Sequence, residues 1–190
     1  MIRAFVATEI PPFEPLAQLL SRLRNSGARI SVPRSEGIHV TLKFLGDIRD
    51  ETVAEILGNL AESASKIAPF EARVSGTGAF PNRRNPRVLW VGLEDNGMLG
   101  RIAMSVDEYL SKLGFPKESR PFTPHITVAR VKSGTGIESA VRLIEESEGM
   151  EFGSFQVKDI RLKKSTLTPT GAIYEDLGVV SLGKDAASGA

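Results

Sequence analysis

Cysteine is absent from the 190 residues of this chain, and histidine occurs only twice. Without cysteine there can be no disulfide framework, no thiolate nucleophile and no cysteine-type zinc site. A chain of this length buries enough surface to be stable without a disulfide or a structural metal. Any imidazole chemistry must therefore depend on the two histidines.

Long apolar runs are also lacking. No stretch approaches the ~20 residues that cross a bilayer, and Glu9 with two prolines interrupts the opening "MIRAFVATEIPP" where a signal peptide needs an apolar core. A net charge of +1 creates no global field for polyanions, so any nucleic-acid site must be local. We expect a soluble, cytoplasmic protein that does not bind membranes.

Strand-like and helix-like segments alternate irregularly along the chain. Runs rich in β-branched and aromatic residues predict strands at 2–10, 37–46, 70–80, 87–93 and 125–131. Apolar residues at helical spacing predict helices at 16–27, 50–68, 97–114 and 136–149. The segments 155–168 and 172–182 are predicted to form a closing hairpin around the turn at 169–171.

This mixed order indicates an α+β fold with largely antiparallel sheets. A histidine-bearing strand precedes a helix in both halves, at 37–68 and 124–148, which suggests a duplication. We expect one bilobal domain over residues 1–182, with two pseudo-symmetric lobes whose sheets flank a central groove and whose helices lie outside. Residues 183–190 are expected to be a polar C-terminal tail.

The two histidines occur in the same pattern, "GIHVTLKF" at 37–44 and "TPHITVAR" at 123–130. Side chains alternate between the two faces of a strand, so His39 and Thr41 share one face, as do His125 and Thr127. The aliphatic residues between them point into a core. If the lobes are pseudo-symmetric, the two pairs line one groove.

Two imidazoles beside two hydroxyls suit displacement at a phosphodiester. Imidazole titrates near neutral pH, so a neutral ring can accept a proton while a protonated ring donates one. A threonine hydroxyl can donate a hydrogen bond to a phosphoryl oxygen. The symmetry of the two motifs leaves open which histidine is the base and which is the acid.

Other kinds of site fit less well. A lone histidine is often a structural residue, but two histidines in one shared motif favour a common role. Two histidines without cysteine or an acidic neighbour make a poor metal site, so we expect neither a metal nor a cofactor. No G-x-S-x-G elbow, P-loop or Rossmann fingerprint is present.

"HVTLKFLG" and "HITVAR" resemble the paired H-x-[ST]-x motifs of the 2H phosphoesterase superfamily. "IRAFVATEIP" and "FPNRRNPRVLWVGL" resemble its RNA 2′,3′-cyclic phosphodiesterase branch, once called 2′-5′ RNA ligases. The resemblance implies action on RNA ends. We also expect that nucleotides can bind and that the protein is a monomer. It implies metal-independent hydrolysis of a 2′,3′-cyclic phosphate to a 2′-phosphate, with weak reverse 2′-5′ ligation. His39 and His125 would be catalytic, and Thr41 and Thr127 would bind the phosphate.

Three further residues adjoin the motifs. Arg130 matches the basic residue that ends the second motif in this branch, and its guanidinium suits phosphate. A regular strand would turn Arg130 away from the groove, so it reaches substrate only if the strand ends or bulges. Lys43 has the parity to reach the groove mouth. Phe44 either packs in the core, as we expect, or stacks on a base.

Two rival functions remain open from the sequence. The fold could hold RNA ends or nucleotides without turning them over, or it could act on a small cyclic phosphate such as a cyclic nucleotide or an ADP-ribose cyclic phosphate. The loop "PNRRNP" at 81–86 is either an RNA-contacting basic loop or a solvated turn. Comparing turnover of cyclic-phosphate RNA with that of free cyclic nucleotides would separate these functions.

Overall fold

The computed structural model describes residues 1–168 and 171–183 of the chain. Its strands are β1 (Ile2–Glu9), β2 (Ile30–Ser31), β3 (His39–Ile48), β4 (Phe70–Phe80), β5 (Val88–Glu94), β6 (His125–Val131), β7 (Glu151–Val157), β8 (Asp159–Thr168) and β9 (Gly171–Ser181). Its helices are α1 (Glu14–Arg24), α2 (Val53–Ala64), α3 (Met98–Ser111) and α4 (Ile137–Glu146), with 3-10 turns η1 (Ser35–Gly37) and η2 (Asp50–Thr52).

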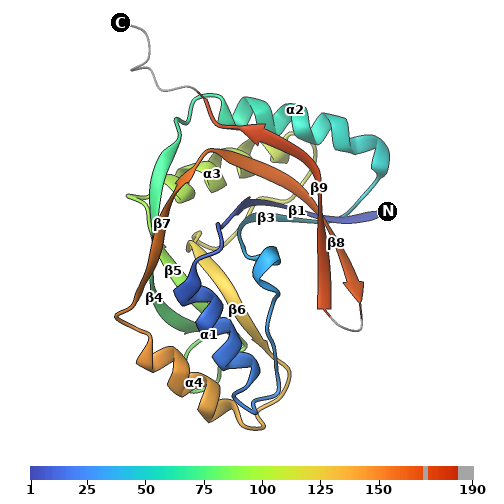
Figure 1. Ribbon diagram of the computed structural model, residues 1–190. Helices are drawn as coiled ribbons and strands as arrows, with labels where there is room; N and C mark the ends of the chain where they lie inside the picture. Colours follow the sequence, from blue (N-terminus) through green and yellow to red (C-terminus); the bar gives the residue numbers. More distant parts are fainter. Residues whose placement is uncertain (169–170, 184–190) are drawn as a thin grey trace, which may run out of the picture.

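All the strands belong to one curled sheet in the order β7-β4-β5-β6-β3-β1-β8-β9, with β2 beside β6. The four helices pack in two pairs, α2 with α3 and α1 with α4. The two pairs lie at opposite ends of the sheet (Figure 1). Each helix turns a stripe of apolar residues inward; in α1 the stripe is Leu16, Leu19, Leu20 and Leu23.

A pseudo-twofold axis relates the two halves of the sheet. Outward from the centre the strands run β3-β1-β8-β9 on one side and β6-β5-β4-β7 on the other. The halves join where Val40 of β3 pairs with Ile126 of β6. The predicted antiparallel α+β fold with two pseudo-symmetric lobes is therefore confirmed, and the two lobe sheets are continuous through this one pair.

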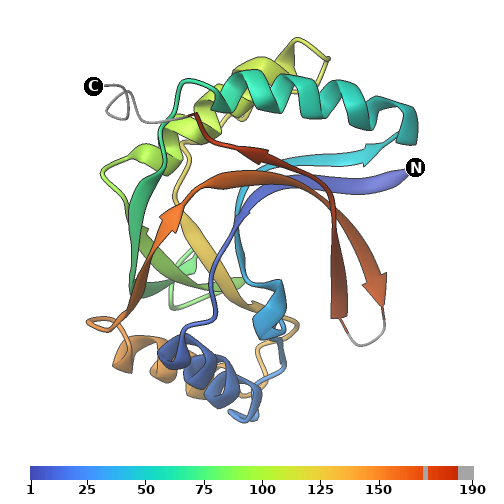
Figure 2. The ribbon, with the colours of Figure 1, turned by 45° about the horizontal axis from the view of Figure 1, so that its top comes forward.

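The predicted closing hairpin is only partly right. Residues 159–168 do pair with β9, but the preceding β7 pairs with β4 in the other half of the sheet. Lys158 alone separates β7 from β8, so the chain crosses the opening of the curled sheet almost without a break (Figure 2). No proline or glycine marks this change of partner. Two predicted features, Pro169 and Thr170 of the turn and the tail from residue 184, lie outside the described residues.

No helix within residues 1–168 and 171–183 combines the length and the apolar character that a bilayer span requires.

Candidate active site

The predicted site lies at the centre of the sheet, around the junction of β3 and β6. Val40 and Ile126 are fully buried on the side that packs against the helices. Their neighbours along each strand point to the opposite side of the sheet, which we call the motif face. The motif face thus carries all four predicted motif residues, His39, Thr41, His125 and Thr127.

A bulge in β6 brings Arg130 to the motif face. The register between β5 and β6 shifts after Thr127, so that Val128 is an extra residue in β6. Such a bulge reverses the alternation of the side chains that follow it. Arg130 therefore shares a face with His125 and Thr127, and the condition under which it was predicted to reach substrate is met.

β3 bulges at the equivalent position, after Thr41, where Leu42 is the extra residue opposite β1. The reversal turns Lys43 towards the helices, where it is 3% exposed, and turns Phe44 onto the motif face, where it is 63% exposed. Both predictions were wrong for the same reason. Lys43 does not reach a groove mouth, and Phe44 is not in the core.

Lys43 instead connects β3 to α3 and to the segment that precedes His125. Its Nζ donates to Oδ1 of Asp107 on α3 at 2.5 Å and to the carbonyl oxygen of Pro116 at 2.7 Å. Asp107 also accepts a hydrogen bond from the backbone N–H of Glu118 at 3.2 Å. Pro116 and Glu118 belong to the segment that leads into His125, so this buried ion pair holds that segment against β3.

The two imidazoles are held by equivalent hydrogen bonds to the backbone. Nδ1 of His39 lies 2.7 Å from the carbonyl oxygen of Gly37, and Nδ1 of His125 lies 2.7 Å from that of Thr123. Because a carbonyl oxygen only accepts, each Nδ1 must carry a hydrogen. In the neutral ring Nε2 then bears the lone pair and is the atom available for proton transfer.

An aromatic ring fixes the plane of each imidazole. Tyr174 of β9 meets His39, and Phe80 of β4 meets His125; in both pairs the ring centroids are 5.0 Å apart and the planes cross at 84°. Phe5, which is 3% exposed, adds a second ring 4.9 Å from His39. Sequence reasoning had not singled out Tyr174, which is 135 positions from its histidine.

Burial lowers the pKa of both His39 and His125 below the usual value near 6.5, against the opposing effect of the hydrogen bond from each Nδ1. The positive charge of Arg130 lowers both pKa values further. Lys163 also lowers the pKa of His39, whereas Glu9 raises it. The charge of Arg130 therefore acts on both imidazoles.

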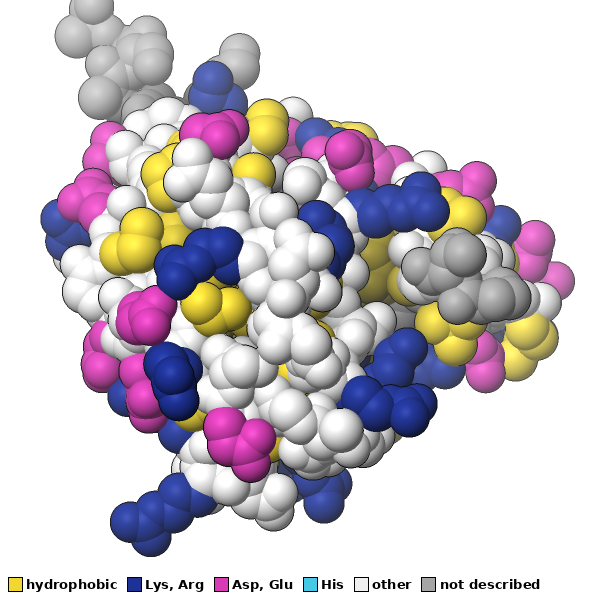
Figure 3. Space-filling view, turned by 60° about the horizontal axis from the view of Figure 1, so that its bottom comes forward, with side chains coloured by type: hydrophobic (Ala, Val, Ile, Leu, Met, Phe, Trp, Pro, Cys, Tyr) yellow, Lys and Arg dark blue, Asp and Glu magenta, His cyan; other side chains and the backbone are white. Residues whose placement is uncertain are grey.

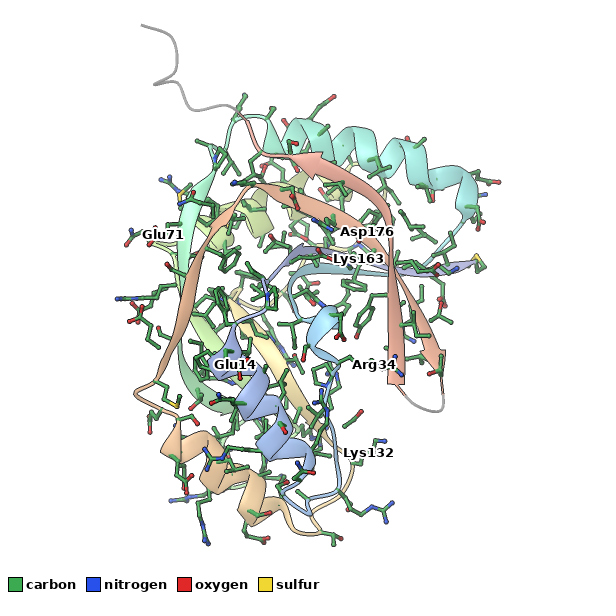
Figure 4. All side chains as sticks on the ribbon, in the orientation of Figure 1. Glu14, Arg34, Glu71, Lys132, Lys163 and Asp176 are labelled. Atoms are coloured by element: carbon green, nitrogen blue, oxygen red, sulfur yellow. The ribbon has the colours of Figure 1, made fainter. Side chains whose placement is uncertain are left out.

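Charged residues from β1, β8 and β9 gather beside His39. Nζ of Lys163 lies 2.6 Å from a carboxylate oxygen of Glu9 and 2.5 Å from one of Asp176. Arg161 contacts the same two carboxylates, at 2.7 Å and 2.8 Å. Figure 4 shows Lys163 and Asp176 close together on adjacent strands. The sequence gives no signal for this charged cluster, because Glu9 and Lys163 are 154 positions apart.

A cavity of about 590 Å³ adjoins the charged cluster; its lining includes Glu9, Arg161 and Ile38, the residue before His39. Neither histidine lines it, so the cavity lies beside the motif residues and does not contain them. From the side of α1 and α4, the surface shows a hollow flanked by Lys and Arg side chains (Figure 3). Across residues 1–168 and 171–183, no three His, Asp or Glu side chains are placed to hold a metal ion.

Comparison with known sequences gives the family. A family model described as LigT-like phosphoesterase matches residues 9–90 and, separately, residues 91–174. The chain belongs to this family. Each match contains one of the two motifs, in agreement with the predicted internal repeat, and the predicted 2H phosphoesterase relationship is confirmed.

Relatives of this LigT-like phosphoesterase match it over nearly its full length. It is 39% identical to the RNA 2′,3′-cyclic phosphodiesterase of Archaeoglobus fulgidus, with 94% of this chain and 99% of that protein covered. It is also 39% identical to the RNA 2′,3′-cyclic phosphodiesterase of Methanocaldococcus jannaschii, over 92% and 97% of the two chains. A crystal structure of a protein from Thermus thermophilus superposes with a TM-score of 0.79 at 30% identity, covering 97% of this chain and all of that one.

Proposed function

We propose that this protein is an RNA 2′,3′-cyclic phosphodiesterase that opens the cyclic phosphate to a 2′-phosphate. The observation that carries the proposal is the pair of equivalently held imidazoles on one face of the sheet, together with two threonines and Arg130. Relatives that bear this activity in their names, at 39% identity over most of the chain, support it.

The arrangement suits an in-line displacement. Because β3 and β6 run antiparallel through the Val40–Ile126 pair, each histidine stands diagonally across from the other, next to the threonine of the opposite strand. A phosphorus atom held between the strands then has one imidazole on each side. Hydroxyl donors and a guanidinium suit the phosphate oxygens that carry the negative charge.

The reaction needs two proton transfers. A neutral Nε2 takes a proton from water as the water oxygen forms its bond to phosphorus. The bond from phosphorus to the ribose 3′-oxygen breaks, and the protonated imidazole supplies that oxygen with a proton. Thr41 and Thr127 donate to the non-bridging oxygens, and Arg130 offsets their charge.

We propose that the reaction proceeds without a metal, since imidazoles perform both proton transfers and side chains stabilise the anion. Excess EDTA should leave the rate unchanged. A loss of activity under EDTA that zinc or manganese restores would contradict this part of the proposal. That the protein acts as a monomer in the cytoplasm stays a prediction from the sequence.

Product analysis tests the proposed reaction. An RNA that ends in a 2′,3′-cyclic phosphate is treated with the enzyme and then with a phosphatase specific for 3′-phosphates. A 2′-phosphate resists the second step, whereas complete release of phosphate would contradict the choice of leaving group. Reversal through the same transition state should join a cyclic-phosphate end to a 5′-hydroxyl through a 2′-5′ bond.

Parallel assays separate the rival functions. The same enzyme is incubated with free 2′,3′-cyclic and 3′,5′-cyclic nucleotides. Faster turnover of these small substrates than of cyclic-phosphate RNA would favour a small-molecule phosphodiesterase. No turnover of any substrate, with RNA ends still bound, would favour a binding module.

A further inference from the structure

Three basic residues form a row beside the site, and the row begins at Arg130. Ser31 of the short strand β2 is the partner of Arg130 on β6. The pairing of the two chain segments continues past this point, because the backbone N–H of Lys132 donates to the carbonyl oxygen of Arg29 at 2.8 Å. Arg29 and Lys132 are therefore neighbours across the two segments, two positions beyond Arg130.

Arg29 and Lys132 share the motif face with Arg130. Side chains alternate along paired strands, so a step of two residues returns to the same face. Ile30, the neighbour of Arg29, packs against the hydrophobic core, as this alternation requires. In Figure 4 the side chain of Lys132 points away from α1 and α4. Lys132 follows Arg130 by about 7 Å along the strand, a separation similar to that of successive phosphates in an RNA strand.

The three cations of this row lack acidic partners. Arg29, Arg130 and Lys132 are exposed, and none of them forms an ion pair with another of the described residues. In the charged cluster, by contrast, Arg161 and Lys163 are both paired with carboxylates. Cations gathered without counter-charges attract an anion. The row is therefore a local anion-binding surface on a chain whose net charge is only +1.

We propose that Arg29 and Lys132 bind the phosphodiester on the 5′ side of the nucleotide that carries the cyclic phosphate. The inference rests on the proposed function and specifies its substrate class, the end of a polynucleotide rather than a free cyclic nucleotide. When the motif residues hold the cyclic phosphate, this phosphodiester is the next anion along the RNA. Contacts to phosphate carry no sequence information, so the preference should depend on the linkage and not on the bases.

The test removes the charge of that phosphodiester from the substrate. One dinucleotide ends in a 2′,3′-cyclic phosphate and has an ordinary internal phosphodiester; the other has an uncharged methylphosphonate at that linkage. The charge selectivity is the ratio of kcat/KM for the first to that for the second. Arg29→Ala combined with Lys132→Ala should lower this ratio about 3- to 30-fold, as expected for the loss of two exposed charge contacts. The loss should appear mainly in KM, because the contact is present before and during the reaction.

Matched variants separate a specific contact from a general effect of charge. Arg29→Lys combined with Lys132→Arg keeps both charges and should keep the charge selectivity. Lys66, near the end of α2, and Arg142 of α4 are also exposed, and Lys66→Ala combined with Arg142→Ala removes the same total charge but should leave the selectivity unchanged. A free 2′,3′-cyclic nucleotide lacks the linkage, so its turnover should be the same in all these variants. Thermal melting checks that each variant is folded.

Two results would overturn the inference. A fall in charge selectivity of less than about threefold in the double alanine variant would mean that Arg29 and Lys132 do not bind the phosphodiester. An equal loss with both dinucleotides and with the free cyclic nucleotide would mean that they only support the motif residues. If the wild-type protein hydrolysed neither dinucleotide, the proposed function would fail, and the ratio of the dissociation constants of the two dinucleotides would decide the inference by the same limit.

Discussion

At the scale of single residues, the two histidines are expected to be indispensable and non-additive. His39→Ala and His125→Ala should each lower kcat by about 10²–10⁴-fold, since each removes one proton transfer. The double variant should lose less than the product of the two effects, because the residues act as a unit. Steady-state kinetics with a melting curve for each variant measures this. If one variant keeps wild-type activity, that histidine is structural.

The lowered pKa values of His39 and His125 predict where the enzyme is most active. One ring must be neutral and the other protonated, so kcat/KM should give a bell-shaped pH profile that reports the pair in the free enzyme. Burial and Arg130 lower the pKa of both rings, which places the maximum on the acid side of the usual value of about 6.5. A rate that rises steadily into the alkaline range would point to a different base.

Arg130 offers a direct check on that electrostatic argument. In Arg130→Gln a positive charge is lost near both imidazoles, so the pKa of each should rise and both limbs of the profile should move to higher pH. A lower rate alone would only show that Arg130 binds substrate. The shift of the limbs separates the two effects, and unchanged limbs would mean that the charge does not act on the histidines.

At the scale of elements, strand alternation was a reliable guide only as far as the bulges. It correctly grouped His39 with Thr41 and His125 with Thr127. Beyond each threonine it failed, and it misplaced Lys43 and Phe44, since a bulge depends on the register with the neighbouring strand rather than on local sequence. The exposed Phe44 and buried Lys43 follow from that single shift.

The buried ion pair of Lys43 and Asp107 is expected to contribute strongly to stability. Their side chains are 1% and 18% exposed, so Asp107→Ala would leave an ammonium group buried without its partner, at a cost of about 3–5 kcal/mol. The exposed pair Arg49–Glu51, with side chains 68% and 70% exposed, is the matched control. Glu51→Ala should cost less than about 1 kcal/mol.

Denaturant unfolding measures the free energy of unfolding of Asp107→Ala and of Glu51→Ala. The double variant Lys43→Met, Asp107→Ala should lose less free energy of unfolding than Asp107→Ala alone, because no buried charge is then left unpaired. An Asp107→Ala protein no less stable than Glu51→Ala would show that the pair is not structural.

At the scale of the whole molecule, the repeat was visible in the sequence but the exchange of strands between halves was not. β4 from the first half pairs with β5, and β8 from the second half pairs with β1. The charged cluster beside His39 is built by that second exchange, which brings Lys163 and Asp176 next to Glu9. Contacts between residues so far apart leave no trace in local periodicity.

This exchange predicts that the chain unfolds as one unit, as expected for a single domain over residues 1–182. Neither half can complete its sheet alone: a fragment of residues 1–84 would leave β1 without β8 and β4 without β5 and β7. Trp90, the single tryptophan, lies on β5 and pairs with Gly78 of β4 from the first half and Thr127 of β6 from the second. Its fluorescence therefore reports on the contact between the halves, whereas far-UV circular dichroism reports on all elements. In the full chain the two signals should change together in one transition. Residues 1–84 and 85–190, expressed separately, should show no cooperative unfolding. Two separate transitions in the full chain, or a fragment that melts cooperatively alone, would mean that the lobes are independent domains.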